Sequence, residues 1–126
     1  MDGFDLDDTL AGANYKQAGF KRLADIYRDA PVLFTPDSPF VVITARKIEG
    51  KADKLATEQW LQQHEPNCRR TYYVSGSDVA KQKAQIIGRL HLTSYTDNNP
   101  KHLSEMKALL PRVQFYIMRD GQRQPF

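Results

Sequence analysis

The stretch Phe4-Asp5-Leu6-Asp7-Asp8-Thr9-Leu10 places two acids two positions apart, with a hydroxyl two positions further on. In an extended segment, residues i and i+2 point to the same side. Asp5 and Asp7 are therefore expected to face one point, with Thr9 nearby. Carboxylates crowded at one point repel each other unless a cation or a shared proton relieves them. The alternative is an acidic turn after a strand, in which Asp and Thr side chains bond the local backbone.

The composition predicts one globular domain over residues 1–126, with 40% hydrophobic and 26% charged residues and no low-complexity tract. The single cysteine, Cys68, excludes an internal disulfide and fits a reducing compartment. The sequence contains no run of about 18 apolar residues, so no membrane span is predicted. The N-terminus lacks the basic-then-apolar order of a signal peptide. We therefore expect a cytoplasmic protein.

The net charge of +3 and the pI of about 9.0 are compatible with a polyanionic partner but do not require one. One local basic cluster directly follows the apolar run Phe40-Val41-Val42-Ile43: Arg46, Lys47, Lys51 and Lys54. Such a cluster suits a phosphate-rich ligand, and solvated helix lysines are the common alternative.

Apolar runs and turn residues predict five strands that alternate with four helices. The strands are expected at 3–7, 40–43, 71–74, 92–96 and 113–118. The helices are expected at about 15–29 and 51–64, after a cap at Asp78, and from Pro100, with Asn14 capping the first. The tail at 120–122 is polar. This order predicts an α/β, three-layer Rossmann-like fold, in which a mostly parallel five-stranded sheet carries helices on both faces.

In such sheets, ligands bind beyond the carboxyl ends of the strands. Polar side chains follow four successive predicted strands at these ends. They are Asp5, Asp7 and Thr9; then Thr44 and Arg46; then Lys81 and Lys83; then Asp97 and Asn98. A local-turn explanation has to account for each strand end separately, so we favour one shared site.

These segments resemble, in the right order, the four motifs of the haloacid dehalogenase superfamily. The motifs are Asp5-Leu6-Asp7-Asp8-Thr9, Val42-Ile43-Thr44, a lysine, and Tyr95-Thr96-Asp97-Asn98. The resemblance covers roughly positions 3 to 100. It implies the fold of that superfamily and a Mg²⁺-dependent phosphatase that works through an aspartyl-phosphate.

The resemblance also implies roles for individual residues. Asp5 would be the nucleophile, and Asp7 the general acid that later acts as the base. Thr9 and, more directly, Thr44 would hold the phosphoryl group, while the lysine would neutralise charge on the nucleophile and the phosphate. A carboxylate oxygen of Asp5, the main-chain carbonyl of Asp7 and the Asp97 side chain would hold Mg²⁺.

Some positions depart from the family pattern or leave a choice. Asn98 stands where the fourth motif often has a second acid, so we expect it to orient a metal-bound water and to weaken metal affinity. Lys83 is preferred to Lys81 as the motif lysine because an apolar helical segment follows it. We assign no chemistry to Asp8. Arg46 is a candidate contact to the substrate's phosphate or leaving group, with a surface ion pair as the alternative.

Neither gap between the motifs has room for a cap domain. The resemblance therefore implies a minimal, capless member with an open cleft. Such a cleft suits a large substrate, such as a nucleic-acid end or a phosphorylated protein, or a second subunit that completes the site in an oligomer. The basic cluster favours a nucleotide or nucleic-acid phosphate, and a likeness to polynucleotide 3′-phosphatases or deoxyribonucleotidases is plausible at this level.

Two hypotheses from other functional classes stay open. A receiver-like phosphoacceptor signalling domain would need an acceptor Asp at the end of a central strand beyond the acidic pair, where this chain has Thr44. A catalytically silent module that binds an anion or a metal would keep the fold, and Asn98 is compatible with it. The set Asp5, Asp7, Thr44 and a lysine favours the phosphatase.

Overall fold

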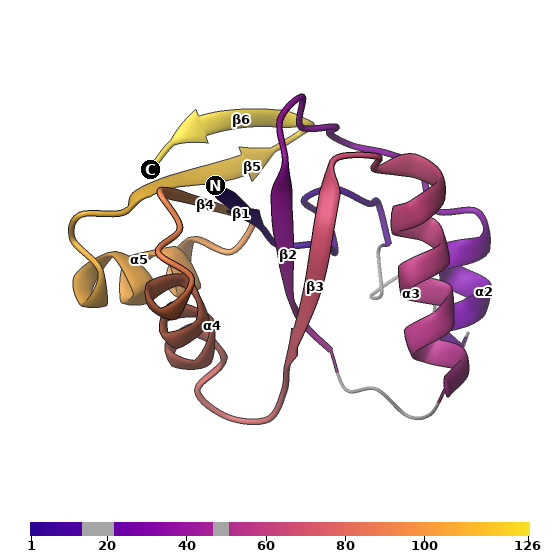
Figure 1. The fold of residues 1–126 in the computed structure, drawn as a ribbon, viewed down its shortest axis with the longest axis horizontal. Coiled ribbons are helices and arrows are strands. Elements are labelled where there is room, and N and C mark those ends of the chain that lie inside the picture. The colour runs from indigo at the N-terminus through magenta and orange to yellow at the C-terminus, as the bar shows by residue number, and fades with distance from the viewer. Residues whose placement is uncertain (14–21, 47–50) are drawn as a thin grey trace.

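The computed structural model describes residues 1–13, 22–46 and 51–126. In chain order the elements are β1 Asp2–Phe4, α2 Leu23–Arg28, β2 Phe40–Ala45, α3 Lys51–His64, β3 Cys68–Val74, α4 Val79–Arg89, β4 Ser94–Asp97, α5 Pro100–Leu109, β5 Gln114–Arg119 and β6 Gln122–Pro125 (Figure 1).

One six-stranded sheet in the order β3-β2-β1-β4-β5-β6 organises the chain. Strands β1 to β5 pair in parallel, and β6 pairs antiparallel with β5. The expectation of an α/β protein with a mostly parallel sheet is therefore confirmed, and the arrangement is consistent with a Rossmann-like fold. The expectation of five strands is wrong by one. Asp120 and Gly121, both at positive φ, form a two-residue turn that returns the polar tail to the sheet as β6.

Helices pack on both faces of this sheet, because alternate side chains of the central strands point to opposite sides. Val41 and Ile43 of β2 belong to a core cluster that includes residues of α4 and α5. Phe40 and Val42 belong to a second cluster that includes Tyr27 of α2 together with residues of α3. The two helix pairs accordingly lie on either side of the sheet in Figure 1.

Several predicted boundaries need correction. The first strand ends at Phe4 and not at Asp7, so the acidic stretch lies beyond the strand. Asp78 precedes α4 with a left-handed backbone and makes no capping hydrogen bond through its side chain, so the predicted cap is wrong. Instead Asn99 caps α5, since its side-chain oxygen accepts hydrogen bonds from two backbone N–H groups. Asn14 and Lys47 lie outside the described residues.

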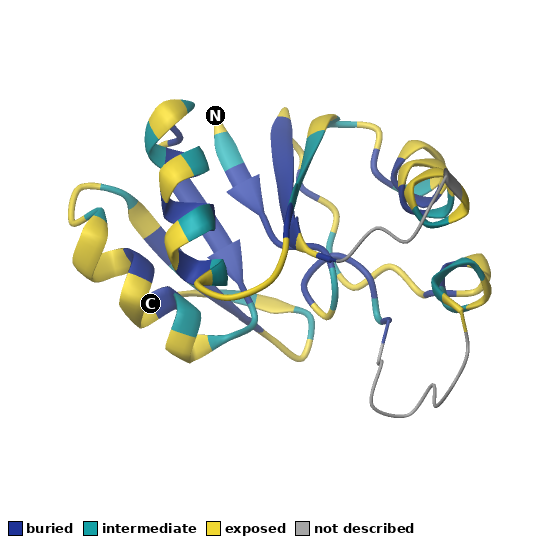
Figure 2. Cartoon of the chain, turned by 90° about the horizontal axis from the view of Figure 1, so that it is seen from below, coloured by how far each residue is buried: buried dark blue, intermediate teal, exposed yellow. Residues whose placement is uncertain are grey.

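The register of the central strands places the polar segments at one edge of the sheet. Phe4 pairs with Val42 on one side and with Thr96 on the other. The backbone N–H of Asp5 then donates to the carbonyl of Thr96 at 2.8 Å. The residues that follow β1, β2 and β4 therefore leave the sheet at the same edge. Figure 2 shows that the central strands of the sheet are largely buried.

Among the described residues, no helix combines the length and the apolar character needed to cross a bilayer.

A buried carboxyl group at the end of α3 makes the stability of this fold sensitive to pH. Glu65 is 1% exposed; one oxygen accepts a hydrogen bond from the Thr35 hydroxyl at 3.2 Å, and the other has no partner among the described residues. Burial raises the pKa of Glu65 from 4.5 to about 7. Between these values the unfolded chain releases a proton that the folded chain retains. The free energy of unfolding should therefore fall as the pH rises through this range.

We predict that Glu65→Gln removes part of this fall. The measurement is urea unfolding of wild type and variant at about pH 5 and about pH 8. For each protein, the free energy of unfolding at the higher pH is subtracted from that at the lower pH, and the two differences are compared. Glu58→Gln, which removes an exposed carboxyl group from the same helix, is the matched control and should leave the difference unchanged. An identical pH difference in wild type and Glu65→Gln would contradict the prediction.

Candidate active site

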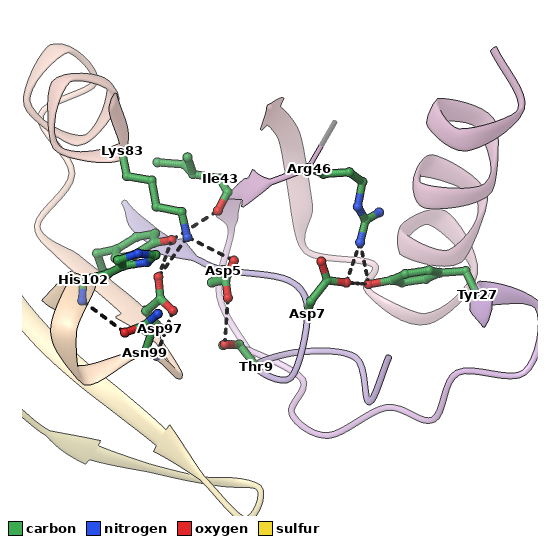
Figure 3. Close-up of polar contacts among 11 residues, drawn as sticks. Asp5, Asp7, Thr9, Tyr27, Ile43, Arg46, Lys83, Asp97, Asn99 and His102 are labelled. Atoms are coloured by element: carbon green, nitrogen blue, oxygen red, sulfur yellow. Dashed lines mark hydrogen bonds and ion pairs between the residues drawn. The ribbon is translucent and has the colours of Figure 1, made fainter. Parts of the chain in front are cut away.

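A buried ion cluster occupies the carboxyl edge of the sheet. The ammonium of Lys83 donates to Asp5 Oδ1 at 3.1 Å and to Asp97 Oδ2 at 2.9 Å. The Lys83 side chain is only 2% exposed, and both carboxylates are buried. The three side chains come from the end of β1, from α4 and from the end of β4, and they point toward one another in Figure 3.

Helix α4 places Lys83 in this position through its apolar face. Ala80 and Ile87, three residues before and four residues after Lys83, are buried on the same side of the helix. Lys81 is exposed, so of the two lysines considered it is Lys83 that reaches Asp5 and Asp97. Tyr95 supports the cluster from β4: its hydroxyl donates to the carbonyl of Ile43 at 3.1 Å and lies 3.3 Å from Asp97 Oδ2.

The electrostatics of this cluster are unbalanced, because one ammonium faces two carboxylates. Burial, followed by the charge of Asp97, raises the pKa of Asp5 to about 8, and the opposing effect of Lys83 is smaller. Burial lowers the pKa of Lys83, but Asp5, Tyr95 and Asp97 together hold it well above its ordinary value. Lys83 is therefore charged at neutral pH, and the two acids compete for its charge.

The Asn98 amide lies 3.2 Å from both Asp5 Oδ2 and Asp97 Oδ1. In one orientation its nitrogen donates to both carboxylates. This orientation satisfies both carboxylates and is therefore the one assigned to the protein without a metal. A cation bound between the carboxylates would require the amide to turn its oxygen toward the ion.

The donor set of this site fits Mg²⁺ in its chemistry. No three His, Cys, Asp or Glu side chains form a metal-binding group in the part of the chain that the structure describes. However, Mg²⁺ is usually held by one or two carboxylates, with water and substrate oxygens completing its shell. Asp5 and Asp97 supply the two carboxylates, and Asn98 supplies an amide oxygen.

Both predicted phosphate-binding threonines are fully buried, and one of them contacts Asp5. The hydroxyl of Thr9 donates to Asp5 Oδ2 at 3.4 Å. Thr44, at the end of β2, is fully buried, and its hydroxyl has no hydrogen-bond partner among the described residues. A buried hydroxyl without a partner is costly, so the Thr44 side chain is a ready donor for a ligand oxygen.

Asp7 turns its side chain away from the Lys83 cluster, contrary to the expectation that both acids aim at one point. Its Oδ1 accepts hydrogen bonds from the Tyr27 hydroxyl and from the Arg46 guanidinium (Figure 3). The physical reason is that β1 ends at Phe4, so the alternation of an extended strand does not govern Asp7. Asp5 and Asp7 still line the same cavity, of about 250 Å³, together with Lys83, Asp97 and Asn98.

Arg46 is buried, and the ion pair that it forms with Asp7 is not the surface pair considered as an alternative. Its guanidinium bonds Asp7, Tyr27 and Thr57. Of the predicted basic cluster, Arg46 is therefore buried and bonded to other side chains, whereas Lys54 is exposed on α3. A larger cavity of about 540 Å³ lies between α3 and β3, lined in part by Lys54, and none of the predicted catalytic residues contributes to it.

Two tyrosines that contact the site, Tyr95 and Tyr27, were not expected from the sequence to do so. Tyr95 lies within the fourth predicted motif, and its alternation with Asp97 along β4 could have indicated that both side chains lie on one side. Tyr27 carries no local signal, because it reaches Asp7 from a helix 20 positions further along the chain.

No protein-family model, curated protein or solved structure matches this chain.

We predict that Lys83→Met destabilises the fold by about 3–5 kcal/mol in the absence of Mg²⁺, because two buried carboxylates lose their shared cation. Lys81→Met removes an exposed lysine from the same helix and should change the free energy of unfolding by less than about 0.5 kcal/mol. Urea unfolding of both variants measures the difference. Equal effects of the two substitutions would contradict the central position of Lys83.

Proposed function

We propose that this protein is a phosphomonoester hydrolase of the haloacid dehalogenase type, with Asp5 as its nucleophile. The observation that supports this most directly is the buried cluster of Asp5, Lys83 and Asp97 at the carboxyl edge of a mostly parallel sheet. Ligands of such sheets bind at this edge. Burying three charges costs stability, and such perturbed groups are concentrated at functional sites.

The reaction proceeds in two steps in this proposal. An oxygen of Asp5 attacks phosphorus and the bond from phosphorus to the leaving oxygen breaks, while Asp7 gives its proton to that oxygen. Water then attacks phosphorus and transfers a proton to Asp7. The bond from phosphorus to Asp5 breaks, which releases inorganic phosphate and restores both acids. Lys83 offsets negative charge at the nucleophile, and the Thr44 and Thr9 hydroxyls are suited to donate to phosphoryl oxygens.

Mg²⁺ would be held by the carboxylates of Asp5 and Asp97, the main-chain carbonyl of Asp7 and, directly or through water, Asn98. When bound, it supplies positive charge that brings an anionic ester close to an anionic nucleophile. The presence of Asp5, Asp97 and Asn98 in the lining of one cavity supports this assignment.

The finer fold assignment belongs to the same proposal: a three-layer haloacid-dehalogenase-like core without a cap domain, in a cytoplasmic protein. The substrate class that we favour is a nucleotide or a nucleic-acid end that carries a phosphomonoester. The overall charge of +3 supports an anionic substrate, whereas Lys54 lines the separate cavity between α3 and β3. Arg46 is already bonded to Asp7 and Tyr27, so its predicted contact with substrate would require an exchange of partners.

The silent binding module remains the second candidate because of one observation. Lys83 and one orientation of the Asn98 amide satisfy both buried carboxylates with hydrogen bonds, as a purely structural cluster would. For the receiver-like alternative, β2 ends in Thr44 and Ala45, where an acceptor Asp would be needed.

The test is hydrolysis of p-nitrophenyl phosphate with and without Mg²⁺. We predict Mg²⁺-dependent phosphate release by the wild type and background release by Asp5→Asn, since the amide is a poor nucleophile. Asp120→Asn makes the same carboxylate-to-amide change in the exposed β5–β6 turn and should retain wild-type activity. Circular dichroism of each variant checks that the fold is intact.

Activity that persists in folded Asp5→Asn would overturn the nucleophile assignment. If the wild type releases phosphate neither from this ester nor from nucleotides and 3′-phosphorylated oligonucleotides, the binding module becomes the better hypothesis.

We also predict that the wild type binds Mg²⁺ and that Asp97→Asn weakens this binding by at least about tenfold. Isothermal titration calorimetry with Mg²⁺ alone measures both, with Asp120→Asn again as the control. Asn98→Asp adds a negative charge to the donor set and should tighten binding. Equal affinity of wild type and Asp97→Asn would show that the ion binds elsewhere.

A further inference from the structure

Asp7, the proton-transfer group of the proposed reaction, is held by one side chain from helix α2 and one that follows strand β2. The Tyr27 hydroxyl of α2 donates to Asp7 Oδ1, and so does the Arg46 guanidinium that follows β2. The same guanidinium nitrogen donates to the Tyr27 hydroxyl oxygen at 2.8 Å. Figure 3 shows the three groups meeting apart from the Lys83 cluster.

We propose that Tyr27 is a positioning residue for Asp7: together with Arg46 it fixes one carboxylate oxygen, so that the other transfers the proton. This inference rests on the proposed phosphatase chemistry and adds a residue to it.

The hydrogen bonds distinguish the two oxygens of Asp7. Both contacts converge on Oδ1, whereas no described residue donates to Oδ2. The Asp7 side chain is 17% exposed and lines the cavity that Asp5 also lines. One oxygen is therefore anchored in the protein, and the other receives no hydrogen bond from a described residue, in a side chain that lines the cavity. Fixed orientation of a proton-transfer group is a recognised source of rate acceleration.

The groups that hold Asp7 are themselves fixed by packing. Tyr27 is 3% exposed, and its ring meets the edge of the Trp60 ring with centroids 5.9 Å apart. The Arg46 guanidinium lies 4.6 Å from the Tyr27 ring centroid. Arg46 also donates to the hydroxyl of Thr57, which in turn donates to the carbonyl of Asp53 at 2.9 Å. Helices α2 and α3 thus form a rigid support behind Asp7.

This role predicts an effect that depends on the leaving group. A p-nitrophenolate leaves without needing a proton, whereas an alkoxide needs one from Asp7. Loss of the Tyr27 hydroxyl should therefore slow phospho-enzyme formation from an alkyl phosphate far more than from p-nitrophenyl phosphate. Damage to the fold would slow both reactions equally.

The experiment compares wild type, Tyr27→Phe and Asp7→Asn with p-nitrophenyl phosphate and glycerol 2-phosphate, in the presence of Mg²⁺. Rapid-quench measurement of the first turnover isolates phospho-enzyme formation. Tyr27→Phe keeps the ring that packs on Trp60 and Arg46 and removes only the hydroxyl. Tyr116→Phe makes the same change in β5, where the ring stacks with Arg123 and makes no contact with Asp7.

We expect the rate of phospho-enzyme formation by Tyr27→Phe to fall about tenfold or more with glycerol 2-phosphate, in the same direction as for Asp7→Asn. With p-nitrophenyl phosphate the rate should fall less than about twofold. Tyr116→Phe should match the wild type with both esters. Equal losses with the two esters, or no loss with either, would overturn the role of Tyr27 and leave the phosphatase assignment standing. If the wild type turns over neither these two esters nor nucleotides and 3′-phosphorylated oligonucleotides, the phosphatase assignment is overturned, and the role of Tyr27 with it.

Discussion

The shared ammonium of Lys83 is the interaction on which the carboxyl edge of this protein depends. It neutralises one charge of a pair of buried carboxylates that could not otherwise lie so close together. The arrangement requires β1 and β4 to be neighbours in register and α4 to present the buried Lys83 to the sheet edge. Each of these conditions is a property of the whole sheet. The site is therefore as much a product of the strand order as of the residues that form it.

The same interaction leaves one negative charge of the site without a partner of opposite charge. Lys83 carries one positive charge and faces two carboxylates, and burial keeps water from making up the difference. The pKa of about 8 for Asp5 reflects this imbalance, which either a proton or a further cation can relieve. Apolar side chains of similar size would often stabilise such a position better than buried ions do. Retaining the ions is easier to explain by chemistry than by stability.

The sequence was informative where local pattern and topology act together. Apolar β-branched runs and helical spacing identified the parallel sheet, and this fixed the edge at which Asp5, Thr44, Lys83 and Asp97 gather. Asp120-Gly121 is a dipeptide typical of two-residue hairpin turns, so it could have predicted that the polar tail returns to the sheet as β6. The side-chain direction of Asp7 could not be predicted, because it depends on where α2 and α3 place Tyr27 and Arg46. No spacing within the acidic stretch encodes that position.

The structure thus divides two acids, only two positions apart, between the two layers of helices. Lys83 of α4 donates to Asp5, whereas Tyr27 of α2 and Arg46, which also contacts Thr57 of α3, donate to Asp7. Had both acids extended from β1, they would have competed for one cation. The end of the strand at Phe4 allows each acid its own partner while both still line one cavity. The proposed reaction needs different environments for its nucleophile and its proton-transfer group, and this division would supply them within three residues of chain.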